Sequence, residues 1–428
     1  MNEMSQLQTL AHAQALDEKD PLRPYATEFY KKDGITYVDG NSLGLCSKRA
    51  EQAVLSVFAM WKQHGIDGWG EGTYPWFTLS ERIGQALASL VGAHPDEVIA
   101  TGSTTSNLHQ LLATFYRPEG KRTKIVTDAL NFPTDFYVIK SHLRLHHDDG
   151  QTHLRVVESQ DGHTLCEDDI IAAMDEEVAV VLLSSVLYRS AQRLSLKKLT
   201  DAAHARGIII GFDLCHSIGS IPHTLSADGV DFAVWCTYKH LNGGPGSVAG
   251  LYVHRRHHDR MPGLAGWFGS NKEKQFDMSP TFTQGDGAGA FQMGTPHLLS
   301  LAPLIGALEL FAEVGLEAVR EKSLKLTDYF LALLAAFPET QVFTVRTPIA
   351  HEQRGGHIYL EHKEAARICK ALKQAGVIPD YRAPSGIRIA PVALYNSFTD
   401  VYTVVITLRQ IMKDKTYERF SNTREVIA

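Results

Sequence analysis

An aspartate and a lysine end two apolar segments of the chain, and together they could carry out carbonyl chemistry. Asp213 closes the run GIIIGFD (207–213), and Lys239 follows the strand-like run DFAVWC (231–236), ahead of a glycine-rich loop. A lysine at a buried strand end is placed to be desolvated, which lowers the pKa of its ammonium group and frees the amine as a nucleophile. Enzymes that use pyridoxal 5′-phosphate (PLP) need such a pair, one residue for the pyridinium nitrogen and one for the Schiff base. Many α/β proteins also place Asp and Lys at strand ends, so the pair alone does not identify a PLP enzyme.

Hydroxyl side chains gather where a predicted strand gives way to a predicted helix, in the run ATGSTTSNLHQLL (100–112). Free backbone N–H groups at a helix start, helped by the hydroxyls of Thr104 and Thr105, would form an anion site. Ordinary N-capping by Ser or Thr is the alternative. Because three successive hydroxyl residues exceed what one cap requires, the run favours a phosphate site.

Two further runs contain residues that suit an aromatic cofactor, each with a plain structural alternative. His216, in DLCHSIG (213–219), is either a core histidine or a group that orients Asp213 and reaches the phenolate oxygen of a bound ring. Phe132, in NFPTDFY (131–137), either packs at a turn or stacks on a ring, and Asp135 offers a second carboxylate in the same run.

Ligand contact is also predicted for two runs nearer the C-terminus. Trp267 and Phe268 are adjacent aromatics in the glycine-rich run LAGWFGS (264–270), which fits a binding loop better than a core segment. Arg388 alternates with isoleucines in SGIRIAP (385–391) and either faces solvent or holds a substrate carboxylate in a bidentate clamp. The runs 146–149 (HHDD) and 255–259 (RRHHD) are predicted to be solvated surface, so no metal site is expected.

Seven apolar runs between residues 90 and 255 alternate with helical patterns, which predicts a mostly parallel sheet covered by helices on both faces. The runs are EVIATG (97–102), KIVTDA (124–129), LRVVES (154–159), VAVVLLSSV (178–186), GIIIGFD (207–213), DFAVWC (231–236) and VAGLYVH (248–254). Ligands then belong beyond the carboxyl ends of the strands, where Asp213 and Lys239 fall.

The C-terminal part has a different character and predicts a smaller α+β unit. The run 304–337 is helical and is expected to break at Gly315, and short strands are expected around HIYL (357–360) and GIRIAP (386–391). An amphipathic helix is expected in the first twenty residues, with Leu7, Leu10, Ala11 and Leu16 on its apolar face. We therefore expect an arm at 1–64 that packs on the small domain, a large domain at 65–310 and a small domain at 311–428.

The composition is that of a globular protein, with 428 residues, 44% hydrophobic and 21% charged residues and a formal net charge of −6. A net negative charge gives no reason to expect nucleic acid or an anionic membrane as a partner. Five scattered cysteines without a CxxC pair fit reduced thiols, so a cytoplasmic location is expected.

Taken together, these runs resemble the kynureninase family, which belongs to the PLP-dependent fold-type I (aspartate-aminotransferase-like) superfamily. The resemblance runs from YVDGNSLGL (37–45) through FPTD (132–135), GFDLCHSIG (211–219), WCTYKHLNGGPGSVAGLYVH (235–254) and LAGWFG (264–269) to RIAPVALYNSF (388–398), nearly the whole chain. One departure is Thr295-Pro296-His297, where relatives often carry Asn-Pro-Pro. That departure leaves open the preference between kynurenine and 3-hydroxykynurenine.

The resemblance implies a role for each candidate residue. Lys239 would carry PLP as a Schiff base, Asp213 would hold the pyridinium nitrogen, and Tyr238 would either deliver protons or serve only as a phosphate ligand. The implied cofactor shell comprises Thr104, Thr105, Phe132, Pro133, Thr134, Asp135, Asp213, His216, Tyr238, Lys239, Trp267 and Thr295. Substrate contacts are implied for Arg388, Trp267 and Phe268, with Arg388 on the α-carboxylate. Because the family builds its site across a homodimer interface, Trp267 and Thr295 are expected to reach the neighbouring subunit's cofactor.

The implied activity is PLP-dependent hydrolysis of L-kynurenine, or of its 3-hydroxy form, to anthranilate or 3-hydroxyanthranilate and L-alanine. This reaction belongs to the kynurenine pathway and serves either tryptophan catabolism or NAD biosynthesis. One alternative is a C–S lyase or desulfurase of the same fold, which would need a reactive cysteine in a mobile loop; Cys215 and Cys236 are predicted in strand contexts instead. The other alternative is a binding or regulatory subunit that has lost catalysis. The presence of Lys239 and Asp213 argues against it.

Overall fold

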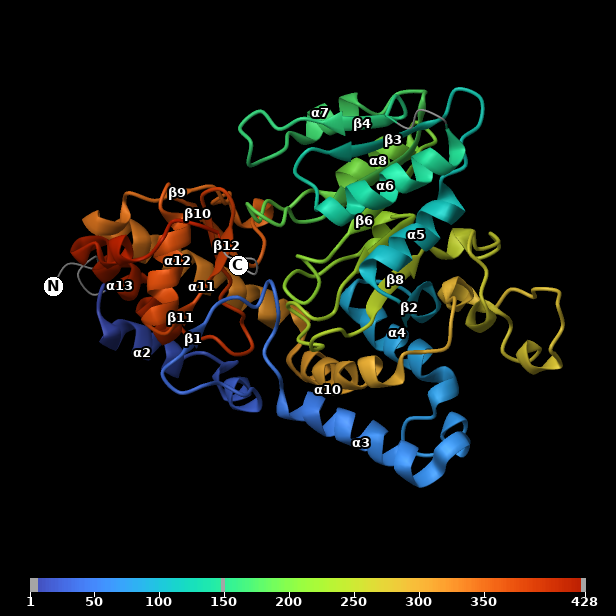
Figure 1. Cartoon of the computed structure of the whole chain (residues 1–428), viewed down its shortest axis with the longest axis horizontal. Helices are drawn as coiled ribbons and strands as arrows, with labels where there is room; N and C mark the ends of the chain where they lie inside the picture. The colour runs from blue at the N-terminus through green and yellow to red at the C-terminus, as the bar shows by residue number, and fades with distance from the viewer. Residues whose placement is uncertain (1–6, 148–150, 425–428) are drawn as a thin grey trace.

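A seven-stranded mixed sheet forms the centre of the larger of two lobes. The computed structural model describes residues 7–147 and 151–424 of the chain (Figure 1). The strands of this sheet are β2 (Val98–Thr101), β3 (Lys124–Asp128), β4 (Leu154–Val157), β5 (Val178–Ser184), β6 (Ile209–Asp213), β7 (Phe232–Trp235) and β8 (Ala249–Val253). Their order is β2-β8-β7-β6-β5-β3-β4. Strand β8 is antiparallel to the other six strands, which all run in the same direction. All seven predicted strands are therefore confirmed, and so is the mostly parallel sheet.

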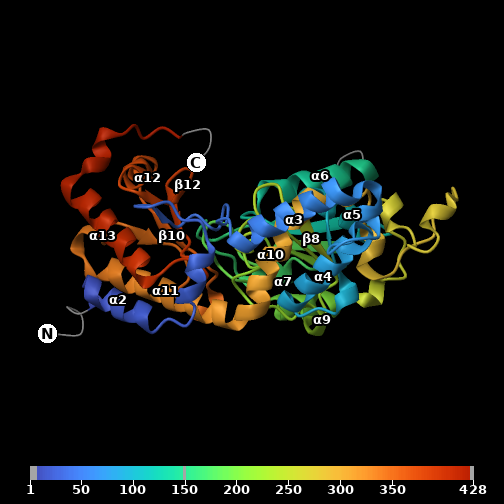
Figure 2. The same ribbon diagram turned by 90° about the horizontal axis from the view of Figure 1, so that it is seen from below.

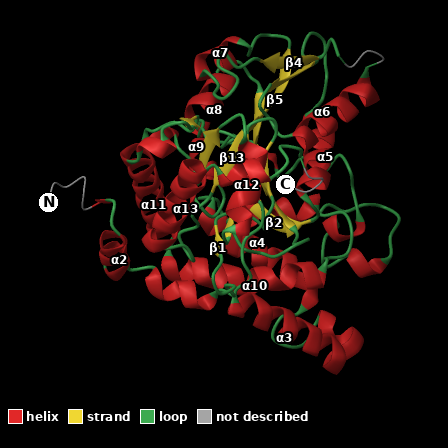
Figure 3. Cartoon of the chain, turned by 60° about the vertical axis from the view of Figure 1, so that its left-hand side comes forward, coloured by secondary structure: helices red, strands yellow, loops and turns green. Residues whose placement is uncertain are grey.

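Helices bury both faces of this sheet, because side chains alternate along each strand. In β5, Val180 and Leu182 join a core with the helices α5 and α6, whereas Val181 and Leu183 join the core on the opposite face. Figure 3 shows the strands inside a shell of helices. The helices of this lobe are α4 (Leu79–Leu90), α5 (Thr104–Phe115), α6 (Pro133–His146), α7 (Glu167–Ala172), α8 (Leu196–His204) and α9 (Leu225–Asp228).

The second lobe has its own sheet and its own core, as the α+β prediction requires. The four-stranded antiparallel sheet has the order β12-β13-β10-β9, and a separate parallel pair joins β1 to β11. Its strands are β1 (Thr36–Tyr37), β9 (Thr344–Val345), β10 (Ile358–Glu361), β11 (Val377–Ile378), β12 (Asp380–Arg382) and β13 (Gly386–Ile389). Its helices are α2 (Leu10–Glu18), α11 (Leu316–Ala336), α12 (Ala365–Gln374) and α13 (Phe398–Asp414). The two lobes lie side by side in the view of Figure 2.

Two long helices connect the lobes. The helix α10 (Leu298–Val314) packs along α3 (Lys48–His64) beside the large sheet, and α11 continues into the small lobe after a break at Gly315, as predicted (Figure 1). Gly315 has φ of +78°, a backbone conformation that favours glycine. The division at residues 64 and 310 stays a prediction.

The apolar face predicted for the N-terminal helix is wrong in part. Leu10 is 43% exposed and Ala11 is also exposed, whereas Ala13 and Asp17 are the buried residues of α2. Asp17 is buried because its carboxylate accepts the backbone N–H groups of Phe398 and Thr399 at the start of α13. The buried face of α2 therefore depends on a contact with the start of α13, which a local sequence pattern cannot show.

Within residues 7–147 and 151–424, no single helix is both long and apolar enough to cross a bilayer. Together, α10 and α11 have the length and the apolar composition of a membrane span, but the two helices are bent by 83° relative to each other.

Candidate active site

A cavity of about 380 Å³ opens where the carboxyl ends of the parallel strands meet the small lobe. We call it the Lys239 cavity. Nine of the predicted site residues line it: Thr104, Thr105, Phe132, Thr134, Asp213, His216, Tyr238, Lys239 and Arg388. Eight of them come from the large lobe, and Arg388 reaches the cavity from β13 of the small lobe. The topology of two sheets thus brings together side chains that are far apart in the chain.

Lys239 projects into the cavity from the loop after β7. Its Nζ lies 2.8 Å from Nε2 of His216 and 5.8 Å from the centre of the Phe132 ring. The loop is fixed because the backbone N–H of Asn242 donates to the Lys239 carbonyl (2.9 Å) and the N–H of Gly44 donates to the Tyr238 carbonyl (2.8 Å). A half-buried amine is thereby held between an imidazole and an aromatic face.

Asp213 ends β6, lines the same cavity as this lysine and is 6% exposed. Burial raises the pKa of its carboxyl group, and a hydrogen bond from Cys215 together with the positive charge of Lys239 opposes that rise. The backbone N–H of Cys215 donates to Oδ1 of Asp213 at 2.6 Å. The neighbouring Asp135 is fully buried, and burial, followed by the charge of Asp213, raises its pKa. Of these two residues only Asp213 lines the cavity, where its carboxylate would stabilise a cation.

At the hydroxyl-rich start of α5, some side chains cap the helix and others face the cavity. Ser103 is the N-cap, because its Oγ accepts the N–H of Ser106 at 3.2 Å and Ser106 reciprocates. Thr104 and Thr105 follow within the first helical turn and line the cavity, and Thr105 Oγ1 lies 2.8 Å from Thr134 Oγ1. The capping box uses the hydroxyls of Ser103 and Ser106, so those of Thr104 and Thr105 remain for an anion at the helix start.

Arg388 is buried, with 1% exposure, and is held on three sides. Its Nε donates to Oδ2 of Asp380 at 2.5 Å, and its two terminal nitrogens donate to the Tyr188 carbonyl (2.7 Å) and to Oγ of Ser42 (2.9 Å). Arg382 donates to the same Asp380 oxygen at 2.8 Å. A guanidinium has five N–H donors, so Arg388 keeps donors for a carboxylate in the cavity.

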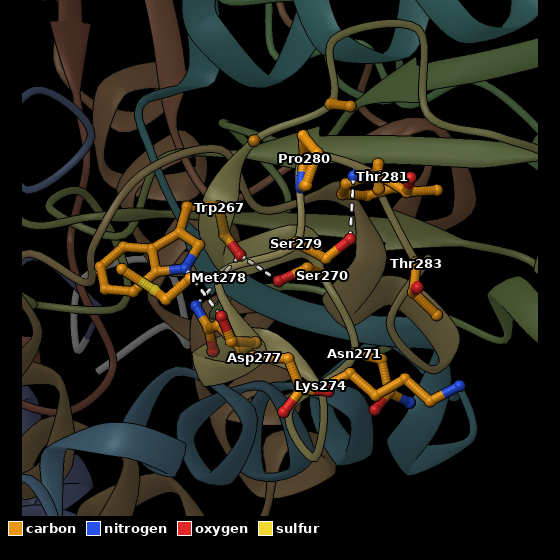
Figure 4. Close-up of a pocket in the computed structure, with 14 residues that line it drawn as sticks. Trp267, Ser270, Asn271, Lys274, Asp277, Met278, Ser279, Pro280, Thr281 and Thr283 are labelled. Carbon is orange, nitrogen blue, oxygen red and sulfur yellow. Dashed lines mark hydrogen bonds between the residues drawn. The ribbon is translucent and has the colours of Figure 1, made fainter.

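Five predicted residues do not line the Lys239 cavity: Pro133, Asp135, Trp267, Phe268 and Thr295. Phe268 is 2% exposed and packs against the rings of Trp69 (5.8 Å) and Phe77 (6.2 Å). Trp267 is 48% exposed and lines a separate cavity of about 880 Å³ formed within the loop 265–283 (Figure 4). Thr295 is exposed. Within one chain, the aromatic loop therefore does not reach Lys239.

Seven residues that line the cavity were missing from the sequence predictions: Asn41, Ser42, Ser184, Val186, Tyr188, Cys215 and Arg382. A signal existed for the first two, because they lie in the run YVDGNSLGL that carried part of the family resemblance. Cys215 corrects a prediction, since it lies in the turn after β6 and not in a strand. It is buried, however, and its Sγ accepts the N–H of Cys236 at 3.1 Å.

The histidine runs are not simply solvated surface. His257 is 5% exposed and lies 2.8 Å from the buried Asp231, so the surface prediction is wrong for this residue. His147 stacks on His153 with ring centres 3.7 Å apart. Asp148 and Asp149 lie outside the described residues. In the parts of the chain that are described, no three His, Cys, Asp or Glu side chains are placed to hold a metal ion.

Comparison with known proteins decides the family. The chain is 60% identical over 428 residues to a kynureninase from Geobacillus thermodenitrificans, covering all of both chains. The chain belongs to the kynureninase family. A second kynureninase, from Bacillus cereus, is 59% identical over 98% of both chains, and residues 319–408 match the kynureninase C-terminal domain.

Solved structures with the same fold as this kynureninase-family chain include PLP enzymes. A cysteine desulfurase from Thermococcus onnurineus matches with a TM-score of 0.77 and 16% identity, over 91% of this chain and 98% of that one. A mutant of the enzyme C-DES, with glycine covalently linked to its PLP cofactor, matches with a TM-score of 0.77 and 17% identity, over 90% and 98%. At such identities the likeness shows the fold alone, and the predicted fold type I is confirmed.

The motif loop that carries Asn41 and Ser42 leaves no room for a side chain at Gly44. A Cβ atom there would lie 2.2 Å from Oδ1 of Asn242 and 2.5 Å from the carbonyl oxygen of Lys239. We therefore expect Gly44→Ala to destabilise the protein by about 2 kcal/mol or more and to lower activity, because the lysine loop must shift. Thermal unfolding and initial rates measure both effects. Gly70→Ala is the matched control, since a Cβ there meets no atom within 4 Å; equal behaviour of the two variants would contradict the prediction.

Proposed function

We propose that this chain is a PLP-dependent hydrolase that cleaves L-kynurenine, and its 3-hydroxy form, into L-alanine and anthranilate or 3-hydroxyanthranilate. Membership of the kynureninase family at 60% identity over the full length supports this proposal. The observation that carries it is the arrangement of one cavity, in which Lys239, Asp213 and Arg388 face the same space. The reaction lies in the kynurenine pathway. A cytoplasmic location is proposed because all five cysteines are free.

The residues of the Lys239 cavity fit PLP in charge and in shape. Asp213 would hold the pyridinium, which would in turn stabilise the ionised form of this buried carboxylate. Phe132, which leaves 38% of its surface exposed at the cavity, would stack on the ring, and the buried Nδ1 of His216 has no hydrogen-bond partner among the described residues. The start of α5, with Thr104 and Thr105, would take the phosphate. When bound, PLP supplies an electron sink that stabilises negative charge at the substrate Cα.

The chain's own residues would then bind, orient and move protons. Arg388 would hold the α-carboxylate, and Lys239, once free of the cofactor, would take the Cα proton. Tyr238 stands next to Lys239 in the chain; burial raises the pKa of its phenol, so the phenol stays protonated at neutral pH and has a proton to give. Its role as a phosphate ligand stays an alternative. Closure of the cavity around the aryl group would exclude bulk water.

Product formation tests the function directly. The protein loaded with PLP is expected to convert L-kynurenine into anthranilate, measured by the growth of anthranilate fluorescence, and to convert 3-hydroxykynurenine in a parallel assay. The ratio of kcat/KM for the two substrates settles the preference that Thr295 leaves open. Release of sulfide from L-cysteine, without anthranilate from kynurenine, would instead support the desulfurase alternative and overturn the proposal.

A homodimer with shared active sites is part of the proposal. The loop 265–283 projects from the large lobe (Figure 2) and exposes Trp267, Phe276 (64%) and Met278 (74%). Large apolar side chains gathered on one exposed loop mark an interaction surface. A second copy of the chain would cover this surface, and its Trp267 and Thr295 would reach the Lys239 cavity.

Complementation tests the shared site. Lys239→Ala and Trp267→Ala are each expected to be weakly active alone. When they are mixed and allowed to exchange subunits, each heterodimer regains one native site, so about a quarter of the native activity should return for a two-fold symmetric dimer. Light scattering after size-exclusion chromatography checks the oligomeric state. No recovery in a mixture proven to exchange would contradict a site shared through Trp267.

A further inference from the structure

Asn41 is buried in the wall of the Lys239 cavity with its amide unused. The side chain is 0% exposed, and neither Nδ2 nor Oδ1 has a hydrogen-bond partner within the described part of the chain. A buried amide without partners is unfavourable, because the hydrogen bonds that it made to water are not replaced. Two neighbouring polar side chains of the cavity do have partners: Ser42 accepts from Arg388, and Ser184 donates to Oδ1 of Asn131 at 2.8 Å. The free amide therefore points to a ligand that pairs with it.

Hydrogen bonds hold the backbone on both sides of Asn41, which limits where its amide can lie. The N–H groups of Ser42 (3.0 Å) and Leu43 (3.2 Å) both donate to the Asp39 carbonyl, and Asp39 forms a bridge with Ala390 at the end of β13. The next anchor is Gly44, whose N–H donates to Tyr238 beside Lys239. The loop thus connects the small-lobe strand that carries Arg388 to the lysine loop, and Asn41 lies between the two.

The polar groups of kynurenine limit which atom of the substrate can form a hydrogen bond with this amide. Arg388 would take the α-carboxylate, and the α-amine is engaged with the cofactor under the proposed function. The ketone oxygen, on the carbon next to Cβ, is the remaining polar group close to these two anchors. An amide offers it an N–H donor, and it also offers an acceptor for a water molecule that adds there.

We propose that Asn41 binds the aryl ketone of the substrate and holds the hydrate that forms from it. This inference rests on the proposed function. Water adds its oxygen to the ketone carbon, and the ketone oxygen, which gains the π electron pair and a proton, accepts a hydrogen bond from Nδ2. The new hydroxyl donates to Oδ1. When that hydrate collapses, one oxygen re-forms a C=O bond, the bond to Cβ breaks with its electron pair on Cβ, and the hydroxyl proton passes to Cβ through Tyr238.

Asn41→Ala and Asn41→Asp are expected to lower kcat for L-kynurenine by about 10²–10³-fold, the usual effect of losing one donor to a developing oxyanion, with a smaller change in KM. The aspartate variant keeps the shape of the side chain but replaces the donor with an anion. Leu43→Ala, an exposed neighbour in the same loop, is the matched control and should retain native rates. Thermal unfolding and the absorbance of the bound cofactor establish that each variant is folded and loaded.

Two ligands test the position of the amide without turnover, through changes in the absorbance of the bound cofactor. L-Alanine carries the carboxylate and the amine but no ketone, so the Asn41 variants should bind it within about twofold of the native enzyme. The kynurenine analogue with its ketone reduced to an alcohol is tetrahedral at the hydrated carbon, and the variants should bind it at least tenfold more weakly. Equal weakening for both ligands, or no weakening for either, would overturn the role at the ketone. If the native protein makes no anthranilate, the proposed function fails instead.

Discussion

Replacing Lys239 with alanine is expected to lower kcat for kynurenine cleavage at least ~10³-fold, because one side chain performs two tasks. It links the cofactor covalently, and it moves the proton at Cα. Its Nζ lies 2.8 Å from His216 Nε2, and no other lysine lines the Lys239 cavity in the described part of the chain. A water molecule in the vacated space could bind, but it could not replace a covalent bond.

The covalent link has its own readout. Treatment with borohydride followed by denaturation should leave the cofactor mass on the native chain and none on Lys239→Ala. Lys140→Ala removes an exposed lysine of α6 and serves as the matched control, with native rates and native labelling. If Lys239→Ala kept activity within tenfold of the native enzyme, or still retained the label, another nucleophile would have to be sought.

The strands were predictable because their signal is local. Each apolar run is six to nine residues long, and burial on both sheet faces gives an unbroken apolar pattern. Strand ends then lie at one edge, which is why Asp213 and Lys239 could be paired from the sequence. The prediction of a phosphate site at Thr104 and Thr105 had the same basis, a strand followed directly by a helix start.

The remaining site residues could not be predicted in this way, because they arrive through long-range contacts. Asn41 and Ser42 approach Lys239 only after a loop near the N-terminus pairs with Ala390, which is about 350 positions away in the chain. Phe268 matched a binding-loop pattern, yet it packs against Trp69. His257 lies in a charged run, but the buried Asp231 lies against it. In each case the partner, and not the local pattern, decides the environment.

The second large effect is expected at Arg388. Arg388→Lys keeps a positive charge but removes the planar fork, so it cannot donate at once to Asp380, Ser42, the Tyr188 carbonyl and a substrate carboxylate. Truncating one partner of a buried, hydrogen-bonded charge pair costs about 2–5 kcal/mol. We expect KM for L-kynurenine to rise by about 10²-fold, which corresponds to about 2.7 kcal/mol, and the affinity for L-alanine to fall to a similar extent.

Binding and stability can be separated at this site with two comparison variants. Arg382→Lys changes the other guanidinium on the same Asp380 oxygen, but its side chain is 31% exposed, so a milder loss of stability is expected. Asp380→Asn removes the shared carboxylate and should loosen both arginines without deleting either. If Arg388 holds the substrate, Arg388→Lys will show the largest rise in KM of the three, at a melting temperature close to that of Asp380→Asn. A fall in melting temperature with an unchanged KM would show that Arg388 only joins the lobes. That result would leave the recognition of the α-carboxylate to Arg382, because no other arginine or lysine apart from Lys239 lines the cavity within the described residues.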